Sequence, residues 1–165
     1  MTDRLDIRAI AAELGASQRV QDIASSIYMQ ESSGGRNTAT SNAGAVGGMQ
    51  IIPDTFSRFA DKGWDIANPV HNARAGVRYL MHLDRVSGGD PTLTAAGYYG
   101  GEGAIKKARA GVAVRDPRNP NAPDTLQYAA DVVARLGGGV GKPTAAQAKQ
   151  VSTAPPPALN PDPLK

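Results

Sequence analysis

Apolar residues recur at three- and four-residue intervals along most of this chain, which is the spacing of amphipathic helices. The clearest stripe follows Asn68 and consists of Ala73, Gly76, Val77, Leu80 and Leu83. Clear alternation of apolar and polar residues, the sign of a half-buried strand, appears nowhere in the sequence. We therefore predict a mainly α-helical domain with little or no sheet, supported centrally by the helix after Asn68.

Capping residues predict where the other helices begin and end. A first amphipathic helix over residues 5–14 is expected to end at Gly15. Later helices are expected to start at Ser, Asx or Pro residues: Ser17, Pro53, Asn68, Asp90 and Asp124. The last of them is predicted to run to about Leu136, before three consecutive glycines.

The composition changes after this last helix. The segment GGGVGKPTAAQAKQVSTAPPPALNPDPLK is rich in Gly, Ala and Pro and contains few residues that could anchor a core. We predict one domain over residues 1–140 and a disordered tail or linker over residues 141–165. A chain that ends in such a segment is interpreted as the terminal part of a longer protein.

The composition limits which kinds of metal, disulfide and nucleic-acid site the chain can contain. A chain of 165 residues favours one domain, and the absence of cysteine excludes disulfides and cysteine-based zinc sites. His71 and His82 lie eleven positions apart without a carboxylate motif between them, so metal binding is not expected and no cofactor is implied. The net charge of +3 is too small to indicate nucleic-acid binding.

The N-terminal segment MTDRLDIRAIAAELGAS carries charged residues from position 3 onward and lacks the apolar run of a signal peptide. No stretch of the sequence has the length and hydrophobicity of a transmembrane helix. We therefore expect cytoplasmic synthesis and no membrane insertion.

Glu31 is the residue on which the functional interpretation depends. It continues the apolar face formed by Val20, Ile23, Ala24 and Ile27, so its carboxyl group is expected to face inward. Loss of hydration raises the pKa of a carboxyl group, which a general acid needs near neutral pH. The alternative is a residue at the end of a helix that turns into solvent, and periodicity alone leaves both alternatives open.

A loop rich in small residues follows Glu31. Residues 32–48 include five glycines and several small polar side chains, which allow the backbone to approach a bulky ligand and offer partners for sugar hydroxyl and N-acetyl groups. Flexible surface loops have a similar composition.

The order of motifs around this loop resembles the lytic transglycosylases with a soluble-transglycosylase (SLT) domain. ESSGG, SNAGAVGGMQIIPDT, NPVHNARAGVRYLMHL, AGYYGGEG and DTLQYAADV are similar, in order and spacing, to the family's motifs between about residue 20 and residue 136. The resemblance implies a lysozyme-like helical fold with a substrate groove and peptidoglycan as the substrate. Glu31 matches the family's catalytic acid. The implied substrate-binding residues are Ser41, Met49, Gln50, Tyr98, Tyr99 and Tyr128.

The reaction that the resemblance implies is cleavage between N-acetylmuramic acid and N-acetylglucosamine without water, giving a 1,6-anhydro end. Glu31 would act first as an acid and then as a base, and the sequence shows no second acid in a partner motif. Four acids remain possible partners of Glu31: Asp54, Asp61, Asp65 and Glu102. The favoured interpretation makes Asp54 a first-turn helix acid and the other three solvated loop residues. The alternatives are a hydrolytic muramidase with a second acid and an inactive peptidoglycan-binding module.

Three positions depart from the family pattern. Tyr99 stands where the family usually has asparagine, Asp124 where it has glutamate, and Gly48 where it has leucine. The first departure puts a sugar-facing hydrogen bond in doubt, and the third is expected to remove an apolar contact.

The lack of a signal-peptide pattern and the Pro/Ala-rich tail lead to an expectation about how the domain reaches the cell wall. A domain of a bacteriophage virion or injection machine, delivered to the periplasm as part of a larger protein, is the first interpretation. A secreted bacterial enzyme without its leader is the second.

Overall fold

The computed structural model describes residues 5–137, and these residues fold into helices joined by loops. The helices of this part of the chain are α1 (Ile7–Glu13), α2 (Gln18–Ser32), α3 (Pro53–Phe59), α4 (Pro69–Val86), α5 (Pro91–Gly100), α6 (Glu102–Arg109), α7 (Thr125–Ala134) and the 3-10 helix η1 (Arg135–Gly137). The predicted boundary at residue 140 and the predicted tail lie outside the described residues.

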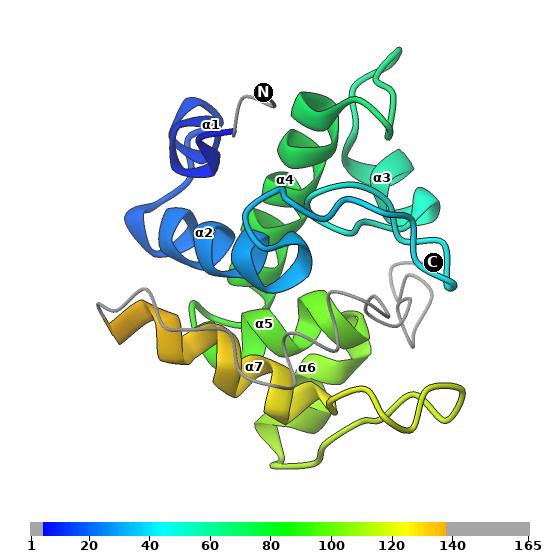
Figure 1. The fold of residues 1–165 in the computed structure, drawn as a ribbon. Helices are drawn as coiled ribbons and strands as arrows, with labels where there is room; N and C mark the ends of the chain where they lie inside the picture. Colours follow the sequence, from blue (N-terminus) through cyan, green and yellow to red (C-terminus); the bar gives the residue numbers. More distant parts are fainter. Residues whose placement is uncertain (1–4, 138–165) are drawn as a thin grey trace.

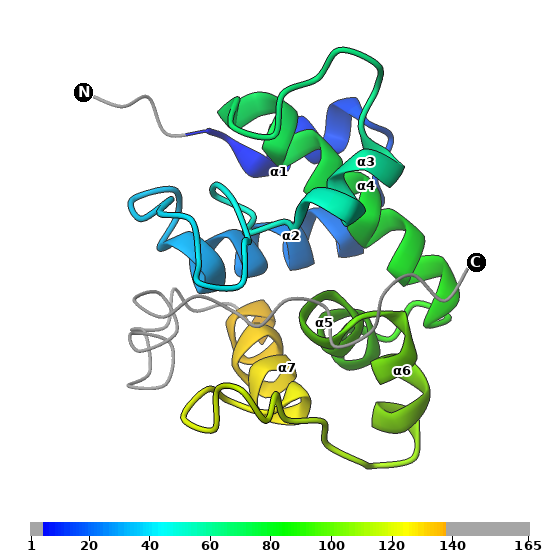
Figure 2. The ribbon, with the colours of Figure 1, turned by 90° about the vertical axis from the view of Figure 1, so that its right-hand side faces the viewer.

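The helices form two groups that meet along α2, α4 and α5. Figures 1 and 2 both show α1 to α4 in the upper half of the molecule and α5 to α7 in the lower half. α4 contacts α1, α2, α3 and α5, whereas α7 packs on α5 and also touches α2. The C-terminal end of α2 therefore lies where helices of both groups come together.

The main core is built on the stripe that predicted α4. Val77, Leu80 and Leu83 are completely buried, and they belong to one cluster with Ile23 and Ile27 of α2. Each buried aliphatic side chain of this size contributes roughly 1.5–3 kcal/mol relative to an exposed one. The prediction that α4 is the central support is confirmed.

Side-chain caps explain why most helix starts were predictable. The Ser17 hydroxyl accepts a hydrogen bond from the amide of Val20, and the Asn68 and Asp90 side chains accept from the first amides of α4 and α5. At α7, Asp124 and Gln127 form a reciprocal capping box. These contacts satisfy amides that have no partner within the helix.

Helix α6 was not predicted, and this omission made one interpretation wrong. Its N-cap, Gly101, has a φ of 87° and no side chain, so no capping residue marks the start. Glu102 opens this helix and is buried, with 8 % of its surface exposed. It is not a solvated loop residue, because the guanidinium of Arg58 and the imidazole of His82 both contact its Oε1.

In the loop between α2 and α3, Val46 and Ile51 form an isolated antiparallel β-bridge, and the described residues form no longer strand. The expected mainly α-helical, lysozyme-like class with little or no sheet is therefore confirmed for residues 5–137. None of the described helices is long and apolar enough to span a membrane.

Candidate active site

Glu31 lies in the last turn of α2, on the side that faces α7. Two polar contacts join α2 to α7 and to η1, which follows it. The Ser26 hydroxyl donates to the carbonyl of Val132 at 2.7 Å, and the Arg135 guanidinium donates to Gln30 Oε1 at 2.6 Å. The Glu31 side chain is buried, with 3 % of its surface exposed. The inward orientation expected from the apolar face of α2 is confirmed.

Only one of the two Glu31 carboxyl oxygens is hydrogen bonded. The hydroxyl of Tyr128, in the first turns of α7, donates to Oε1 at 2.6 Å, while Oε2 is buried and has no hydrogen-bond partner among the described residues. A buried carboxylate with a free oxygen is costly, because an uncompensated charge loses its hydration. The arrangement therefore favours the neutral acid, with its proton on Oε2.

The electrostatics agree with this geometry. Burial raises the pKa of Glu31 from its usual 4.5 to about 8, although the hydrogen bond from Tyr128 acts in the opposite direction. Burial, followed by the nearby Glu31 carboxyl, also raises the pKa of Tyr128 well above its usual value. At neutral pH Tyr128 is therefore a permanent donor, and Glu31 holds a proton that it can transfer.

Tyr98 lies near enough to Glu31 for that carboxyl group to raise the pKa of Tyr98 further, after burial, and its hydroxyl is bonded to Met49. The Tyr98 hydroxyl donates to the backbone carbonyl of Met49 at 2.6 Å, and both side chains are buried. Met49, with no exposed surface, belongs to the core, and Gly76 of α4 lies against it so closely that an added Cβ would approach to 2.8 Å. The Tyr98 hydroxyl is thus committed to the backbone of the loop that precedes α3.

Asn72 fixes the same loop from the opposite side, a role that sequence reasoning did not give it. Its Oδ1 accepts from the amide of Met49 at 3.1 Å, and its Nδ2 donates to the carbonyls of Val46 and Ile66 at 2.9 and 3.0 Å. Gly47 has a φ of 77°, and a Cβ there would meet the Asn72 amide at 2.5 Å. Only the position of Asn72 in a family motif marked it in the sequence.

Ser41 and Gln50 shape the loop from within. Ser41 accepts from the amide of Ala45 through its hydroxyl at 2.9 Å, which closes a tight turn. Gln50 has a φ of 48° and donates through Nε2 to the carbonyls of Ala39 and Gly47, while its buried Oε1 has no hydrogen-bond partner among the described residues. Gln50 Oε1 is therefore a buried acceptor that the described residues leave unsatisfied.

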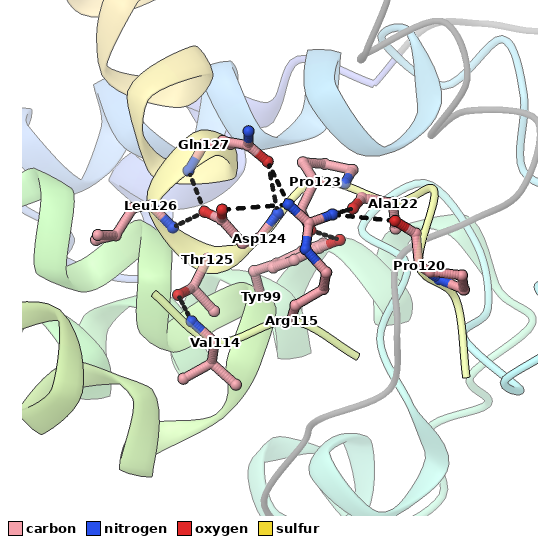
Figure 3. A network of polar contacts seen from close by, with 10 residues as sticks. All are labelled: Tyr99, Val114, Arg115, Pro120, Ala122, Pro123, Asp124, Thr125, Leu126 and Gln127. Carbon is pink, nitrogen blue, oxygen red and sulfur yellow. Dashed lines mark hydrogen bonds and ion pairs between the residues drawn. The ribbon is translucent and has the colours of Figure 1, made fainter. Parts of the chain in front are cut away.

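Tyr99 occupies a different place from Tyr98. Its ring stacks on that of Tyr128, with centroids 4.2 Å apart and an interplanar angle of 17°, and its hydroxyl donates to the carbonyl of Pro123 at 2.8 Å. Figure 3 shows Tyr99 beneath the segment that leads into α7. The Tyr99 hydroxyl thus has a partner within the protein, and its contact with a sugar stays a prediction.

The glycine at position 48 is explained by a neighbouring aromatic ring. A Cβ added to Gly48 would lie 2.5 Å from Cε1 of Tyr28, a buried residue on α2. The ring of Tyr28 thus lies against the position that carries leucine in the family pattern. The expected loss of an apolar contact is offset by this ring.

The four acids considered as partners of Glu31 are engaged or exposed elsewhere. Asp54 is exposed in the first turn of α3, as expected, and Asp61 and Asp65 are exposed, Asp61 in an ion pair with Arg78. Glu102 is held by Arg58 and His82. Within residues 5–137, no group of three or more metal-binding side chains is arranged around a common point.

The helical fold and the buried acid define a lysozyme-like domain. A family model described as the transglycosylase SLT domain matches residues 9–120, which is more than half of the chain. The chain therefore belongs to this family, and membership indicates lytic-transglycosylase-type degradation of peptidoglycan at the level of the family. No curated protein matches the chain. The match ends before α7, so Tyr128 is placed beside Glu31 by the structure.

Proposed function

We propose that this domain is a peptidoglycan lytic transglycosylase in which Glu31 alone supplies acid and base. The observation that carries the proposal is the buried Glu31 carboxyl, with Oε1 held by Tyr128 and Oε2 unpaired. Such a group keeps a proton near neutral pH and holds it on a defined oxygen. Family membership supplies the substrate class, glycan strands of peptidoglycan.

In the first step, Oε2 of Glu31 donates its proton to the oxygen that links N-acetylmuramic acid to N-acetylglucosamine. The bond between that oxygen and C1 of the muramoyl residue breaks, and the sugar ring takes up positive charge. Tyr128, which donates to Oε1, stabilises the carboxylate that remains. Both oxygens are buried, so the glycan must displace nearby groups to reach Oε2.

In the second step, the Glu31 carboxylate takes the proton from the C6 hydroxyl of the same muramoyl residue. The C6 oxygen attacks C1, which closes a 1,6-anhydro ring and returns Glu31 to its acid form. No water is consumed. The loop fixed by Asn72 carries Gln50, whose buried Oε1 would accept from a sugar substituent only after neighbouring groups move, as at Glu31 Oε2.

The engagement of Asp61 and Glu102 in ion pairs favours this one-carboxylate route over hydrolysis, because a hydrolytic muramidase needs a second acid beside the scissile bond. The test is the mass of the disaccharide–peptide released from purified sacculi. An anhydro product is lighter than the hydrolysis product by one water. Release of the heavier product would establish the muramidase alternative, and binding without release would establish the inactive module.

Delivery to the periplasm within a virion or injection machine is also proposed, from the sequence alone. Mass spectrometry of purified phage particles from the source culture tests it. Detection of the domain only in the secreted fraction of uninfected cells would overturn it.

A further inference from the structure

The family position occupied by Tyr99 usually carries asparagine, and the structure gives the tyrosine contacts that asparagine cannot make. Tyr99 is buried, with 2 % of its surface exposed, and lies on α5 between Tyr128 and the segment before α7. Its ring covers one face of Tyr128, whose hydroxyl donates to the Glu31 carboxyl group. The two tyrosines therefore link α5 to the candidate acid through α7.

The hydroxyl end of Tyr99 is held as firmly as its ring. It donates to the carbonyl of Pro123, the residue directly before the N-cap of α7. The Arg115 guanidinium donates to the carbonyls of Ala122 and Pro120 at 2.6 and 3.1 Å and contacts the Asp124 carboxylate at 3.4 Å. Figure 3 shows Arg115 at the centre of these contacts.

A second set of bonds fixes the start of α7. The Val114 amide donates to the Thr125 hydroxyl at 3.0 Å, and the Thr125 amide donates back to the Val114 carbonyl at 2.9 Å. The Asp124 carboxylate and the Gln127 side chain complete the capping box at the same place. The acceptor for the Tyr99 hydroxyl is thus part of a rigid segment.

We propose that Tyr99 is a positioning residue that holds the Tyr128 hydroxyl on Glu31. Its anchor is the carbonyl of Pro123, in a segment that Arg115 holds at the flanking residues Ala122 and Asp124. The backbone of α7 sets where the Tyr128 side chain starts, but the orientation of its ring depends on what packs against it. A stacked neighbour that is itself hydrogen bonded at its far end removes the alternative orientations. The inference rests on the proposed function in that Glu31 is the acid.

The experiment uses two substitutions: Tyr99→Leu, which removes the ring and the hydroxyl, and Tyr99→Phe, which removes only the hydroxyl. Each is made in the parent protein and in the Tyr128→Phe variant. Release of anhydro-disaccharide from sacculi is measured together with the thermal midpoint. In the parent, Tyr99→Leu is expected to lower kcat roughly tenfold, and Tyr99→Phe by a smaller factor. In the Tyr128→Phe background, both substitutions should leave the residual kcat nearly unchanged.

Equal losses in both backgrounds would overturn the proposal, because Tyr99 would then act independently of the Tyr128 hydroxyl. A rise in KM with unchanged kcat would also overturn it and would assign Tyr99 to sugar binding. Tyr99→Phe keeps the stacked ring, so the cycle can be completed even if Tyr99→Leu unfolds.

A second readout separates this inference from the proposed function. Titration of Glu31 by carbon NMR of labelled glutamate needs no turnover, and Tyr128→Phe should move its midpoint upward by removing a hydrogen bond to the charged form. Tyr99→Leu should move it in the same direction, whereas Phe56→Leu, in the separate cluster of Ile51 and Ala75, should not. An unmoved midpoint in Tyr99→Leu would overturn the positioning role even in a fully active enzyme. Shifted midpoints without anhydro product would leave it standing and overturn the proposed function.

Discussion

Two glutamates of this domain are buried to a similar degree, but their carboxyl groups have different partners. Glu31 exposes 3 % and Glu102 exposes 8 % of its surface. Glu102 Oε1 is contacted at 3.1 Å by the guanidinium of Arg58, which balances its charge, and at 2.9 Å by the imidazole of His82. Among residues 5–137, Glu31 has one neutral donor, the Tyr128 hydroxyl, and no cation in contact with its carboxyl group. A buried carboxylate with a cation beside it forms a structural ion pair, whereas a buried carboxyl group without one keeps its proton.

The difference follows from the cost of burying a charge. A carboxylate that leaves water needs an opposite charge or several hydrogen bonds, and otherwise it takes up a proton. Arg58 supplies that charge at Glu102 by joining α3 to α6. The same physical rule thus predicts an ion pair at one site and a proton donor at the other.

The largest expected difference is in turnover. Glu31→Gln keeps the shape of the side chain but removes the transferable proton, so cleavage of sacculi should fall about a hundred- to ten-thousandfold. Glu102→Gln is the matched control and should keep most of the turnover. Binding of the Glu31→Gln protein to sacculi should survive. A normal rate in Glu31→Gln with a normal thermal midpoint would assign the chemistry to another carboxylate.

The second expected difference is in the pH dependence of stability. The pKa of Glu31 is raised from 4.5 to about 8 in the folded protein, so the folded state binds one proton more than the unfolded chain between these values. The free energy of unfolding therefore loses up to ~1.4 kcal/mol per pH unit from this group as the pH rises through that window. Glu31→Gln should become increasingly more stable than the parent from pH 5 to pH 8.

Urea unfolding of both proteins at each pH measures this difference, and contributions from other groups cancel in the comparison. The rate of cleavage should fall in the parent as the pH rises through about 8, where the acid form is lost. A stability difference that stays constant from pH 5 to pH 8 would show that Glu31 is ionised in the folded protein.

The third difference concerns stability at one pH. Glu102→Ala removes the partner of a half-buried Arg58 and should lower the free energy of unfolding by about 1–3 kcal/mol. Part of the cost is relieved because 22 % of the Arg58 side chain is exposed. Urea unfolding at pH 7 measures this loss. Glu31→Gln is measured beside it and should change the free energy of unfolding in the opposite direction, upward. A loss below the error of the measurement would show that the ion pair is not structural.

The sequence predicted one of these two sites and not the other, for a physical reason. The helix of Glu31 is marked by Ser17 and by an apolar face that points the carboxyl inward, and both signals are local. The helix of Glu102 starts at Gly101, which carries no capping side chain, and its partners Arg58 and His82 lie 44 and 20 residues away. Nothing in the local pattern indicates such pairings.

The contacts around Glu31 show the same limit. Tyr128 lies 97 residues from Glu31, and only a resemblance between motifs placed both in one site. Met49 and Asn72 meet because Gly47 and Gly76 leave room for them, which no periodicity indicates. The resemblance assigned Tyr99 to a sugar contact, which stays a prediction, and gave no sign that its hydroxyl donates to the carbonyl of Pro123.

The fourth prediction concerns the Tyr128 hydroxyl, which donates to the Glu31 carboxyl group. Tyr128→Phe keeps the ring that stacks on Tyr99 and deletes the hydroxyl, so turnover should fall about tenfold with a small change in the thermal midpoint. Glu31 retains its proton, so activity should not disappear. A loss as large as that of Glu31→Gln would make Tyr128 a proton-transfer group instead of a donor that positions the acid.

The smallest effect is expected when the His82 contact with Glu102 is removed and the Arg58 contact is kept. His82→Phe keeps a ring beside Phe59, whose centroid lies 5.6 Å from that of the imidazole, and deletes the nitrogen that contacts Glu102. Because Arg58 still contacts the same carboxylate oxygen, the free energy of unfolding should fall by only about 0.5–1 kcal/mol, with turnover unchanged. The control is His71→Phe, which keeps a ring where the imidazole stacks on Trp64. In a Glu102→Gln background the cost of His82→Phe should shrink while that of His71→Phe stays the same. Equal costs of His82→Phe in both backgrounds would show that the imidazole stabilises the fold through its ring alone, and the compensation of Glu102 would then rest on Arg58.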